Sequence, residues 1–228
     1  MQQIPLAIGP EHLPTFDTFL AGPNSEALEH LRSGAPTTAP IYLWGPAGCG
    51  KTHLLRAWAH AAQQDGQRVG WFGAGDAVPW PLAADWTRIV IDDCERLDDE
   101  AQHAAFRVFV EAASQGVQVA AAGRMPPIDL PLRDDLRTRL GWGHVFALRP
   151  LSEPETRAAL RREADRRGIL LSDDVINHLL THFDRDLSSL MNLLDRLDHF
   201  SLSRSRHVTI PLLRTMLAEQ GAAEGSLS

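Results

Sequence analysis

The segment from Ile41 to Leu55, IYLWGPAGCGKTHLL, constrains the fold of this chain more than any other. A short apolar run leads into Gly-x-x-x-x-Gly-Lys-Thr at Gly45 to Thr52, and an amphipathic helical pattern follows. This order of strand, loop and helix is the one that a phosphate-binding P-loop requires. Its glycines let backbone N–H groups approach phosphate oxygens, and the helix points the positive end of its dipole at them. A chance glycine-rich turn is the alternative, and the flanking strand and helix patterns disfavour it.

Two side chains of this loop have specific predicted roles. Lys51 should neutralise the β and γ phosphates of a nucleotide, and Thr52 should place its hydroxyl on Mg²⁺. Lys51 is the only lysine among 22 basic residues, which indicates that a wider guanidinium cannot replace its compact ammonium. The predicted nucleotide-binding residues here are Gly45, Pro46, Ala47, Gly48, Cys49, Gly50, Lys51, Thr52 and His53.

A second motif lies about forty residues further on. The apolar run from Arg88 to Ile91 ends in the carboxylates Asp92 and Asp93, which is a Walker-B pattern. Asp92 should bind Mg²⁺ through its water, and Asp93 should orient or deprotonate the attacking water. Because parallel strands bring their carboxyl ends to one edge of a sheet, this motif and the P-loop should meet. An exposed acidic helix cap is the alternative.

Composition narrows the class of protein. The chain has 228 residues, enough for one α/β core and a small second domain. Its net charge of −7 argues against a general nucleic-acid-binding surface. We expect a cytoplasmic protein, since no apolar run approaches a membrane span and no signal peptide is recognisable. Cys49 and Cys94 fit a reducing compartment as two incidental thiols, although a regulatory disulfide is conceivable.

The segment before the P-loop carries two phenylalanines, Phe16 and Phe19. They should form either a strap packed on the core or a wall of an adenine pocket, and the two roles are compatible. Ser25 is predicted to cap the helix that follows.

Arginines mark the second half of the core. A buried strand from Val117 to Ala122 precedes Arg124, which takes the place where ATPases of this build position a polar residue at the γ phosphate. Arg139 lies in a helix before the strand GHVFAL and could reach the phosphates of a neighbouring subunit. A solvated basic helix end is the alternative for Arg139.

The last seventy residues read as a separate α-helical bundle. Ser152 to Glu155 form a capping box, Gly168 ends that helix and Ser172 caps the next. Arg185, between two bundle helices, could bind phosphate or form a structural ion pair.

The N-terminal segment MQQIPLAIG is open to two interpretations. A glutamine followed by branched apolar residues in an extended segment could dock in an apolar groove. An edge strand or a frayed end fits these residue types equally well.

Together these motifs resemble a known family. YLWGPAGCGKTHLL, IVIDD, the arginine helix before GWG and FDRDLSSLMNLLDRLD are similar to the AAA+ core of the bacterial replication initiator DnaA, and TFDTFLAGPN to its adenine-side segment. The best match is the Hda family, regulatory inactivators of DnaA that have this core and a lid but no C-terminal DNA-binding domain. The resemblance covers roughly residues 3 to 219.

The resemblance implies a fold and a division of the chain. The fold is an α/β AAA+ P-loop core with a parallel sheet, followed by a small helical lid. The expected parts are a clamp-binding segment at 1–10, the nucleotide-binding core at 11–150, the lid at 151–222 and a disordered tail at 223–228.

The resemblance also implies residue roles. It makes Arg139 an arginine finger acting in trans on ATP held by DnaA, and Arg185 a sensor-2 arginine. It favours docking of the N-terminus on the sliding clamp, the β subunit of DNA polymerase III. The clamp-binding residues are Gln3, Ile4, Leu6 and Ile8. Arg124 stands where the family usually has an aspartate, so we expect the chain's own ATPase to be weak or absent.

The expected function is negative regulation of replication initiation. With ADP or ATP and Mg²⁺ bound, ADP being the expected nucleotide, and tethered to the clamp at the replisome, the protein should stimulate hydrolysis of DnaA-bound ATP. No direct sequence-specific DNA contact and no membrane contact are expected, and a homodimer is left open. The alternatives are an ATPase of the helicase-loader type and a non-catalytic adaptor between clamp and initiator.

Overall fold

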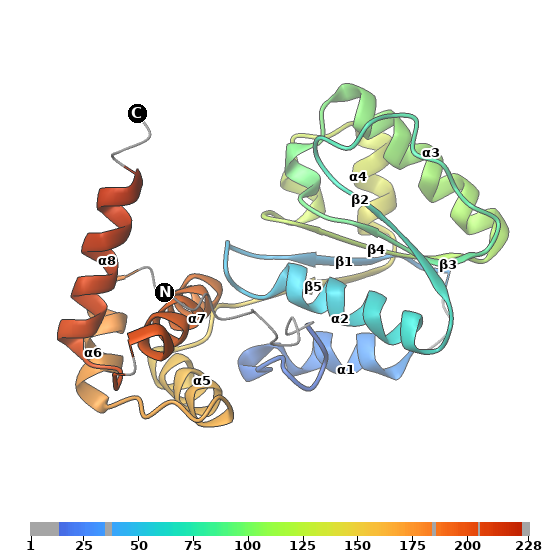
Figure 1. Ribbon diagram of the computed structural model, residues 1–228. Coiled ribbons are helices and arrows are strands. Elements are labelled where there is room, and N and C mark those ends of the chain that lie inside the picture. Colours follow the sequence, from blue (N-terminus) through green and yellow to red (C-terminus); the bar gives the residue numbers. More distant parts are fainter. Residues whose placement is uncertain (1–13, 35–37, 184–185, 205, 225–228) are drawn as a thin grey trace. The chain divides into compact units, whose positions relative to one another are not determined.

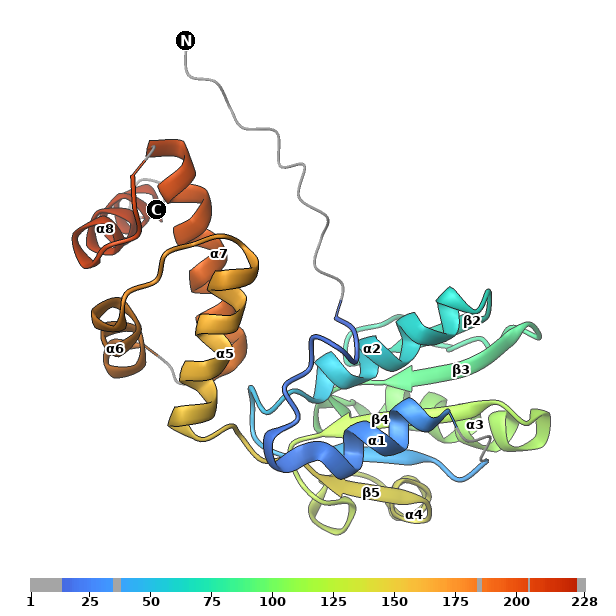
Figure 2. The ribbon, with the colours of Figure 1, turned by 90° about the horizontal axis from the view of Figure 1, so that it is seen from below.

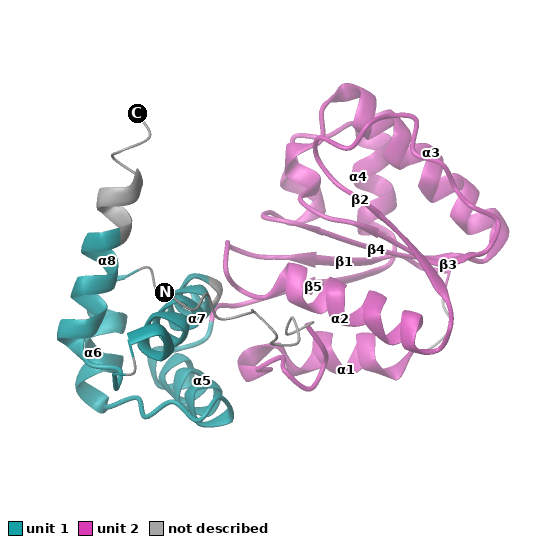
Figure 3. Ribbon diagram, in the orientation of Figure 1, with its two compact units in different colours: residues 1–9, 151–228 teal, residues 10–150 magenta. Residues whose placement is uncertain are grey.

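The computed structural model describes residues 14–34, 38–183, 186–204 and 206–224. The described chain divides into two compact units, one within residues 14–150 and the other within residues 151–224 (Figure 3). Each unit has apolar clusters of its own.

The larger unit is built on a parallel sheet of five strands in the order β2-β3-β4-β1-β5 (Figure 1). The strands are β1 (Ile41–Trp44), β2 (Arg68–Phe72), β3 (Trp86–Ile91), β4 (Gln118–Gly123) and β5 (His144–Ala147). Trp44 at the end of β1 lies opposite Gly123 at the end of β4. The loops that follow β1, β3 and β4 therefore share one edge of the sheet, which confirms the predicted convergence.

Helices cover both faces of this sheet, as a parallel sheet requires (Figure 1). One face packs on α1 (Ser25–Ser33) and α2 (Lys51–Gln64), and Figure 2 looks onto this side. The other face packs on α3 (Asp99–Gln115) and α4 (Asp134–Gly141). Short 3-10 turns complete the unit: η1 (Gly22–Asn24), η2 (Cys94–Arg96) and η3 (Pro127–Asp129).

Alternate residues of the strands supply the two cores. Along β1, Tyr42 belongs to the cluster under α3 and α4, whereas Leu43 belongs to the cluster under α1 and α2. Val90 of β3 faces α1 and α2, and its neighbours Ile89 and Ile91 face the other way. This alternation follows from the two-residue period of a strand.

The predicted cap at Ser25 is wrong. Ser25 is already the first residue of α1, with helical φ and ψ, and Asn24 occupies the N-cap position. The Asn24 side chain makes no capping bond because it pairs with the backbone of Arg149. Its amide donates to Arg149 O at 2.9 Å and accepts from Arg149 N at 2.8 Å. The Asn24 side chain, which occupies the N-cap position, therefore makes a tertiary contact in place of a capping bond.

The smaller unit is a bundle of four helices around one apolar cluster. They are α5 (Glu153–Arg166), α6 (Asp173–His182), α7 (Leu187–Arg204) and α8 (Ile210–Glu224). The predicted capping box is present, because the Glu155 carboxylate accepts from the Ser152 N–H at 2.7 Å. Ser172 caps α6 by accepting from Val175 N, and Gly168 has a left-handed φ of 70° after α5. Among the residues that the structure describes, no helix is long and apolar enough to cross a membrane.

Candidate functional site

The loop between β1 and α2 has the backbone of a phosphate cradle. Gly45, Gly48 and Gly50 have φ values of 155°, 74° and 98°, and α2 begins at Lys51 as predicted. A Cβ added to Gly45 would lie 2.3 Å from Leu148 O, so only glycine fits at this position. Pro46, Ala47 and Gly48 are exposed at the loop tip, whereas Cys49 is buried.

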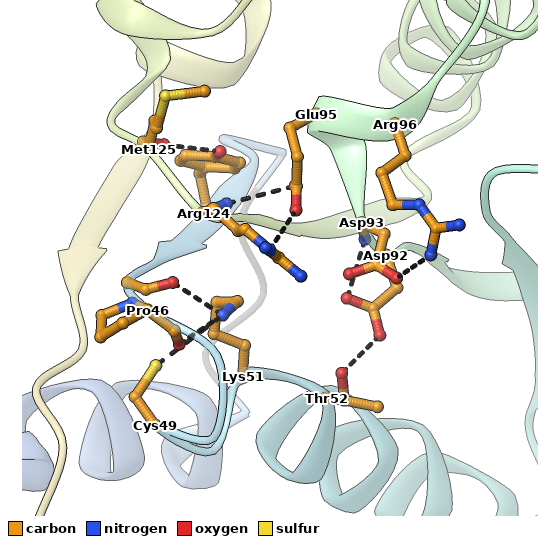
Figure 4. A network of polar contacts seen from close by, with 12 residues as sticks. Pro46, Cys49, Lys51, Thr52, Asp92, Asp93, Glu95, Arg96, Arg124 and Met125 are labelled. Carbon is orange, nitrogen blue, oxygen red and sulfur yellow. Dashed lines mark hydrogen bonds and ion pairs between the residues drawn. The ribbon is translucent and has the colours of Figure 1, made fainter. Parts of the chain in front are cut away.

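Lys51 lies inside this loop rather than in bulk solvent. Its ammonium donates to Gly45 O at 2.8 Å and to Pro46 O at 2.9 Å, and Cys49 Sγ lies 3.8 Å away (Figure 4). A cation that is only 8% exposed and held by two carbonyl oxygens has the charge and position to bind phosphate. Burial raises the pKa of the Cys49 thiol, and both Cys49 and Cys94 are free and buried.

The predicted metal-binding pair comes together across the sheet edge. Thr52 Oγ1 donates to Asp92 Oδ2 at 2.7 Å, and Asp92 Oδ1 accepts from Asp93 N at 2.9 Å. Burial raises the pKa of Asp92, and the hydrogen bond from Thr52 partly opposes this shift. One hydroxyl and one carboxylate suit Mg²⁺, which takes few protein ligands when it is shared with phosphates.

Asp93 adopts a left-handed backbone conformation with φ of 52°, which is uncommon outside glycine. Its carboxylate lies 3.7 Å from Arg96 Nη1. Asp93 is on the same sheet edge as Asp92 (Figure 4), as the predicted role in hydrolysis requires. That role stays a prediction.

The segment before α1 packs directly against the P-loop helix. The Phe19 ring lies so close to Gly50 that a Cβ there would be 2.6 Å from the ring. His53 Nε2 lies 3.0 Å from Thr15 O and 3.2 Å from Thr18 Oγ1, so this side chain binds the segment. Burial lowers the pKa of His53. The core-packing role is thus present, and the adenine-wall role remains a prediction.

Arg124 follows β4, and Glu95 follows β3. Arg124 Nε lies 3.1 Å from Glu95 Oε1, an ion pair that the sequence analysis did not anticipate. The sequence does place an acid and a base just beyond the ends of two strands. Whether the two side chains meet depends on the order of the strands in the sheet.

Arg139 lies at the opposite edge of the sheet from the P-loop. It lines a small pocket with Pro40, which precedes β1, and with Val117 and Val119, which lie just before and within the start of β4. Trp142, which is 64% exposed, lines the same pocket. Four residues of β1 separate the two edges, a distance of about 13 Å. Arg139 is therefore not among the residues that meet at the P-loop, and its predicted role in trans stays a prediction.

Other predicted site residues lie outside the described part of the chain. They are Gln3, Ile4, Leu6, Ile8 and Arg185.

Comparisons with known proteins agree with this geometry. A family model described as Hda, lid domain, matches residues 153–217, and one described as the bacterial DnaA ATPase domain matches residues 11–75. The chain is an Hda-like, DnaA-related AAA+ protein. The family prediction from the motifs is confirmed.

Solved structures share the fold of this Hda-like protein at low sequence identity. Domain III of the Thermotoga maritima replication initiation protein DnaA is 21% identical with a TM-score of 0.76, over 92% of this chain and 97% of that one. AMPPCP-bound DnaA from Aquifex aeolicus is 21% identical with a TM-score of 0.67, over 87% and 69%. The Thermotoga maritima RuvB Holliday junction branch migration motor is 16% identical with a TM-score of 0.61, over 85% and 66%. The AAA+ fold prediction is thereby confirmed.

Proposed function

We propose that this protein limits replication initiation by stimulating hydrolysis of ATP bound to DnaA. An adenine nucleotide, expected to be ADP, occupies the P-loop, and the N-terminal segment tethers the protein to a sliding clamp on DNA. Arg139 then enters the nucleotide site of DnaA. The initiator returns to its ADP form once replication has begun.

The position of Arg139 is the observation that carries this proposal. Its guanidinium has no hydrogen bond or ion pair with another described residue, whereas Arg133 and Arg137, which precede it, pair with Asp135 and Asp134. An arginine left free on a partly exposed surface, far from its own P-loop, suits insertion into a neighbouring site. An arginine supplied in trans accelerates phosphoryl transfer by about 10³ to 10⁵.

The nucleotide in the chain's own P-loop has a supporting role. Lys51 would bind phosphate oxygens, and Thr52 with Asp92 would hold Mg²⁺. The metal would help to neutralise the charge of the phosphates. Since Lys51 already makes two bonds within the loop, it exchanges carbonyl oxygens for phosphate oxygens without leaving its place.

Binding to the clamp brings the protein to DNA. A protein with net charge of −7 gains little from direct contact with phosphate-rich DNA. Attachment to a clamp already on DNA raises the local concentration of the protein near DnaA without any DNA-binding surface. This part of the proposal rests on the sequence of residues 3–8.

The test is turnover of DnaA-bound ATP in a reconstituted reaction with clamp-loaded DNA, with this protein added or withheld. Arg139→Ala should reduce the stimulated rate at least about 10³-fold and leave clamp binding intact. Arg139→Lys should restore little, because an ammonium cannot form the planar fork.

Arg107→Ala is the matched control, since Arg107 is an exposed arginine on α3 that pairs within its own helix with Glu111. If the stimulated rate is unchanged in Arg139→Ala, Arg139 is not an arginine finger, and the non-catalytic adaptor becomes the favoured function. ATP turnover by this protein alone, at the stimulated rate, would favour an ATPase of the helicase-loader type.

A further inference from the structure

A buried asparagine holds the backbone where the chain leaves the sheet. Asn24 is 3% exposed. Its amide nitrogen donates to Arg149 O at 2.9 Å, and its amide oxygen accepts from Arg149 N at 2.8 Å. One side chain thus satisfies both backbone groups of Arg149, as a neighbouring strand would. Since β5 ends at Ala147, Asn24 fixes the backbone just beyond the strand.

This contact leaves helix α1 without a side-chain cap. An asparagine at the N-cap position ordinarily accepts from a backbone N–H of the first turn, but the Asn24 side chain makes no such bond. Natural proteins depart from local preferences of this kind mainly at functional positions. The Asn24 side chain therefore serves the exit of the chain from the sheet and not its own helix.

The residue before Arg149 lies against the start of the P-loop. Leu148 N donates to Trp44 O at 2.7 Å, which continues the pairing of β5 with β1. A Cβ added to Gly45 would lie 2.3 Å from Leu148 O, so the Gly45 backbone and the Leu148 carbonyl are in close contact. The Leu148 peptide is thus held between the P-loop and the residue that Asn24 binds.

Gly45 also binds the cation that we assign to phosphate. Lys51 Nζ donates to Gly45 O at 2.8 Å. Phosphate oxygens would compete for this ammonium, because charge-assisted hydrogen bonds to phosphate are stronger than bonds to a neutral carbonyl. Nucleotide binding should then release Gly45 O and alter the contact of Gly45 with Leu148.

The backbone that Asn24 holds continues into the smaller unit through a short connection. Pro150, Leu151 and Ser152 separate Arg149 from α5. A proline has a fixed φ, and it restricts the residue before it to extended conformations. The path of the backbone as far as Pro150 is therefore set by contacts within the larger unit.

We propose that Asn24 is a positioning residue that couples phosphate binding at the P-loop to the backbone through which the chain leaves the nucleotide-binding unit. This inference rests on the proposed binding of an adenine nucleotide in the P-loop. Asn24 holds Arg149, whose neighbour Leu148 contacts Gly45, and Gly45 O in turn accepts from Lys51. Because coupling is reciprocal, release of Arg149 weakens nucleotide binding, and bound nucleotide steadies the exit of the chain.

The first experiment measures Kd for ADP with Mg²⁺ by calorimetric titration of the full chain. Asn24→Ala removes both bonds to Arg149 and should weaken ADP binding about fivefold or more, the lower end of typical coupling between two sites. Asn24→Asp keeps an acceptor and a good capping side chain, but it places an oxygen against Arg149 O. It should weaken ADP binding at least as much as Asn24→Ala.

Gln102 provides the matched control. It is 5% exposed, its amide donates to Leu97 O at 2.9 Å, and it accepts from Arg133 N at 3.0 Å. Gln102 belongs to α3, which packs on the opposite face of the sheet from α1. Gln102→Ala therefore removes a similar pair of buried bonds on the other face. It should lower Tm as Asn24→Ala does, and it should leave Kd for ADP within about twofold of the native value.

The second experiment measures hydrogen exchange of the Leu148 amide by NMR, without ADP and with saturating ADP and Mg²⁺. This amide donates to Trp44 O, so Asn24→Ala does not remove its acceptor. ADP should slow its exchange about fivefold or more in the native protein and in Gln102→Ala. In Asn24→Ala the protection by ADP should be largely lost.

Equal losses of ADP affinity in Asn24→Ala and Gln102→Ala would overturn the inference, since the effect would then follow from a general loss of stability. Protection of Leu148 by ADP that keeps its native size in Asn24→Ala would also overturn it. If Asn24→Ala does not fold, Asn24→Asp decides by the same two measurements, because it keeps one of the two bonds.

Failure of this inference is distinguishable from failure of the proposed function. If Lys51→Ala loses ADP while Asn24→Ala binds it with native affinity, the P-loop site stands and only the coupling falls. If the native protein does not bind ADP, both proposals fall.

Discussion

The Thr52 hydroxyl donates a 2.7 Å hydrogen bond to the Asp92 carboxylate across 40 positions of sequence. Thr52 lies in the first turn of α2, and Asp92 follows the last residue of β3. The bond therefore joins the P-loop to the Walker-B strand end and brings together the two side chains that we assign to Mg²⁺. The Mg²⁺ dependence of nucleotide binding should rest on this arrangement.

Asp92→Asn should remove the Mg²⁺-dependent part of nucleotide affinity, because an amide keeps the Thr52 contact but lacks the charge. The measurement compares Kd for ADP with Mg²⁺ and with a chelator. Since burial raises the pKa of Asp92, the Mg²⁺ effect in the native protein should fade, as pH is lowered, at a higher pH than an ordinary aspartate would give. A Mg²⁺ effect of native size in Asp92→Asn would contradict the assignment.

Gly50→Ala should disturb the P-loop in two ways. Alanine at φ of 98° is strained by about 1 to 3 kcal/mol, and its Cβ would meet the Phe19 ring. We expect a lower Tm and a loss of ADP affinity by calorimetry. Gly116→Ala is the matched control, since Gly116 also has positive φ but open space around it. It should lower Tm and leave ADP affinity unchanged.

Glu163→Gln should destabilise the helical lid at neutral pH. Hydrogen bonds from Arg166 and then Arg167 lower the pKa of Glu163 to about 2, below its ordinary value of 4.5. The stabilisation is therefore present above pH 4.5 and is lost as the pH falls through 2. The Tm difference between variant and native protein should shrink over this range, and Asp165→Asn, an exposed neighbour, should show little difference at any pH.

Trp142→Ala should weaken association with DnaA without affecting folding. Trp142 is mostly exposed and lies beside Arg139, so its loss should change the free energy of unfolding by less than about 0.5 kcal/mol. An aromatic anchor at an interface contributes about 2 kcal/mol, which is roughly a 30-fold change in Kd. Unchanged binding to DnaA by surface plasmon resonance would exclude the surface around Trp142 from the interface.

Replacing Gln3 and Ile4 by alanine should abolish capture of the protein by immobilised clamp. The same variant should keep native ADP affinity, because the P-loop lies elsewhere in the chain. If the double variant is still captured, the N-terminal segment has a structural role and does not bind the clamp.

The sequence alone determined the P-loop, the Walker-B strand end and the α/β class of this protein. These features are readable because they depend on local chemistry: glycines that permit positive φ, a lysine at fixed spacing, and apolar runs of strand or helix period. Even the approach of Thr52 to Asp92 followed, since parallel strands place their carboxyl ends at one edge. The helical lid was readable for the same reason, from caps and from leucines at helical spacing.

Only the tertiary structure decided which side chains share that edge and which do not. Glu95 meets Arg124 because β3 and β4 are neighbours in the sheet, and Phe19 meets Gly50 because the segment before α1 folds back on α2. Arg139 is placed far from the P-loop because α4 ends where β1 and β4 begin. Periodicity and motif spacing do not specify strand order or where the chain folds back, so these long-range pairings could not be predicted from the sequence alone.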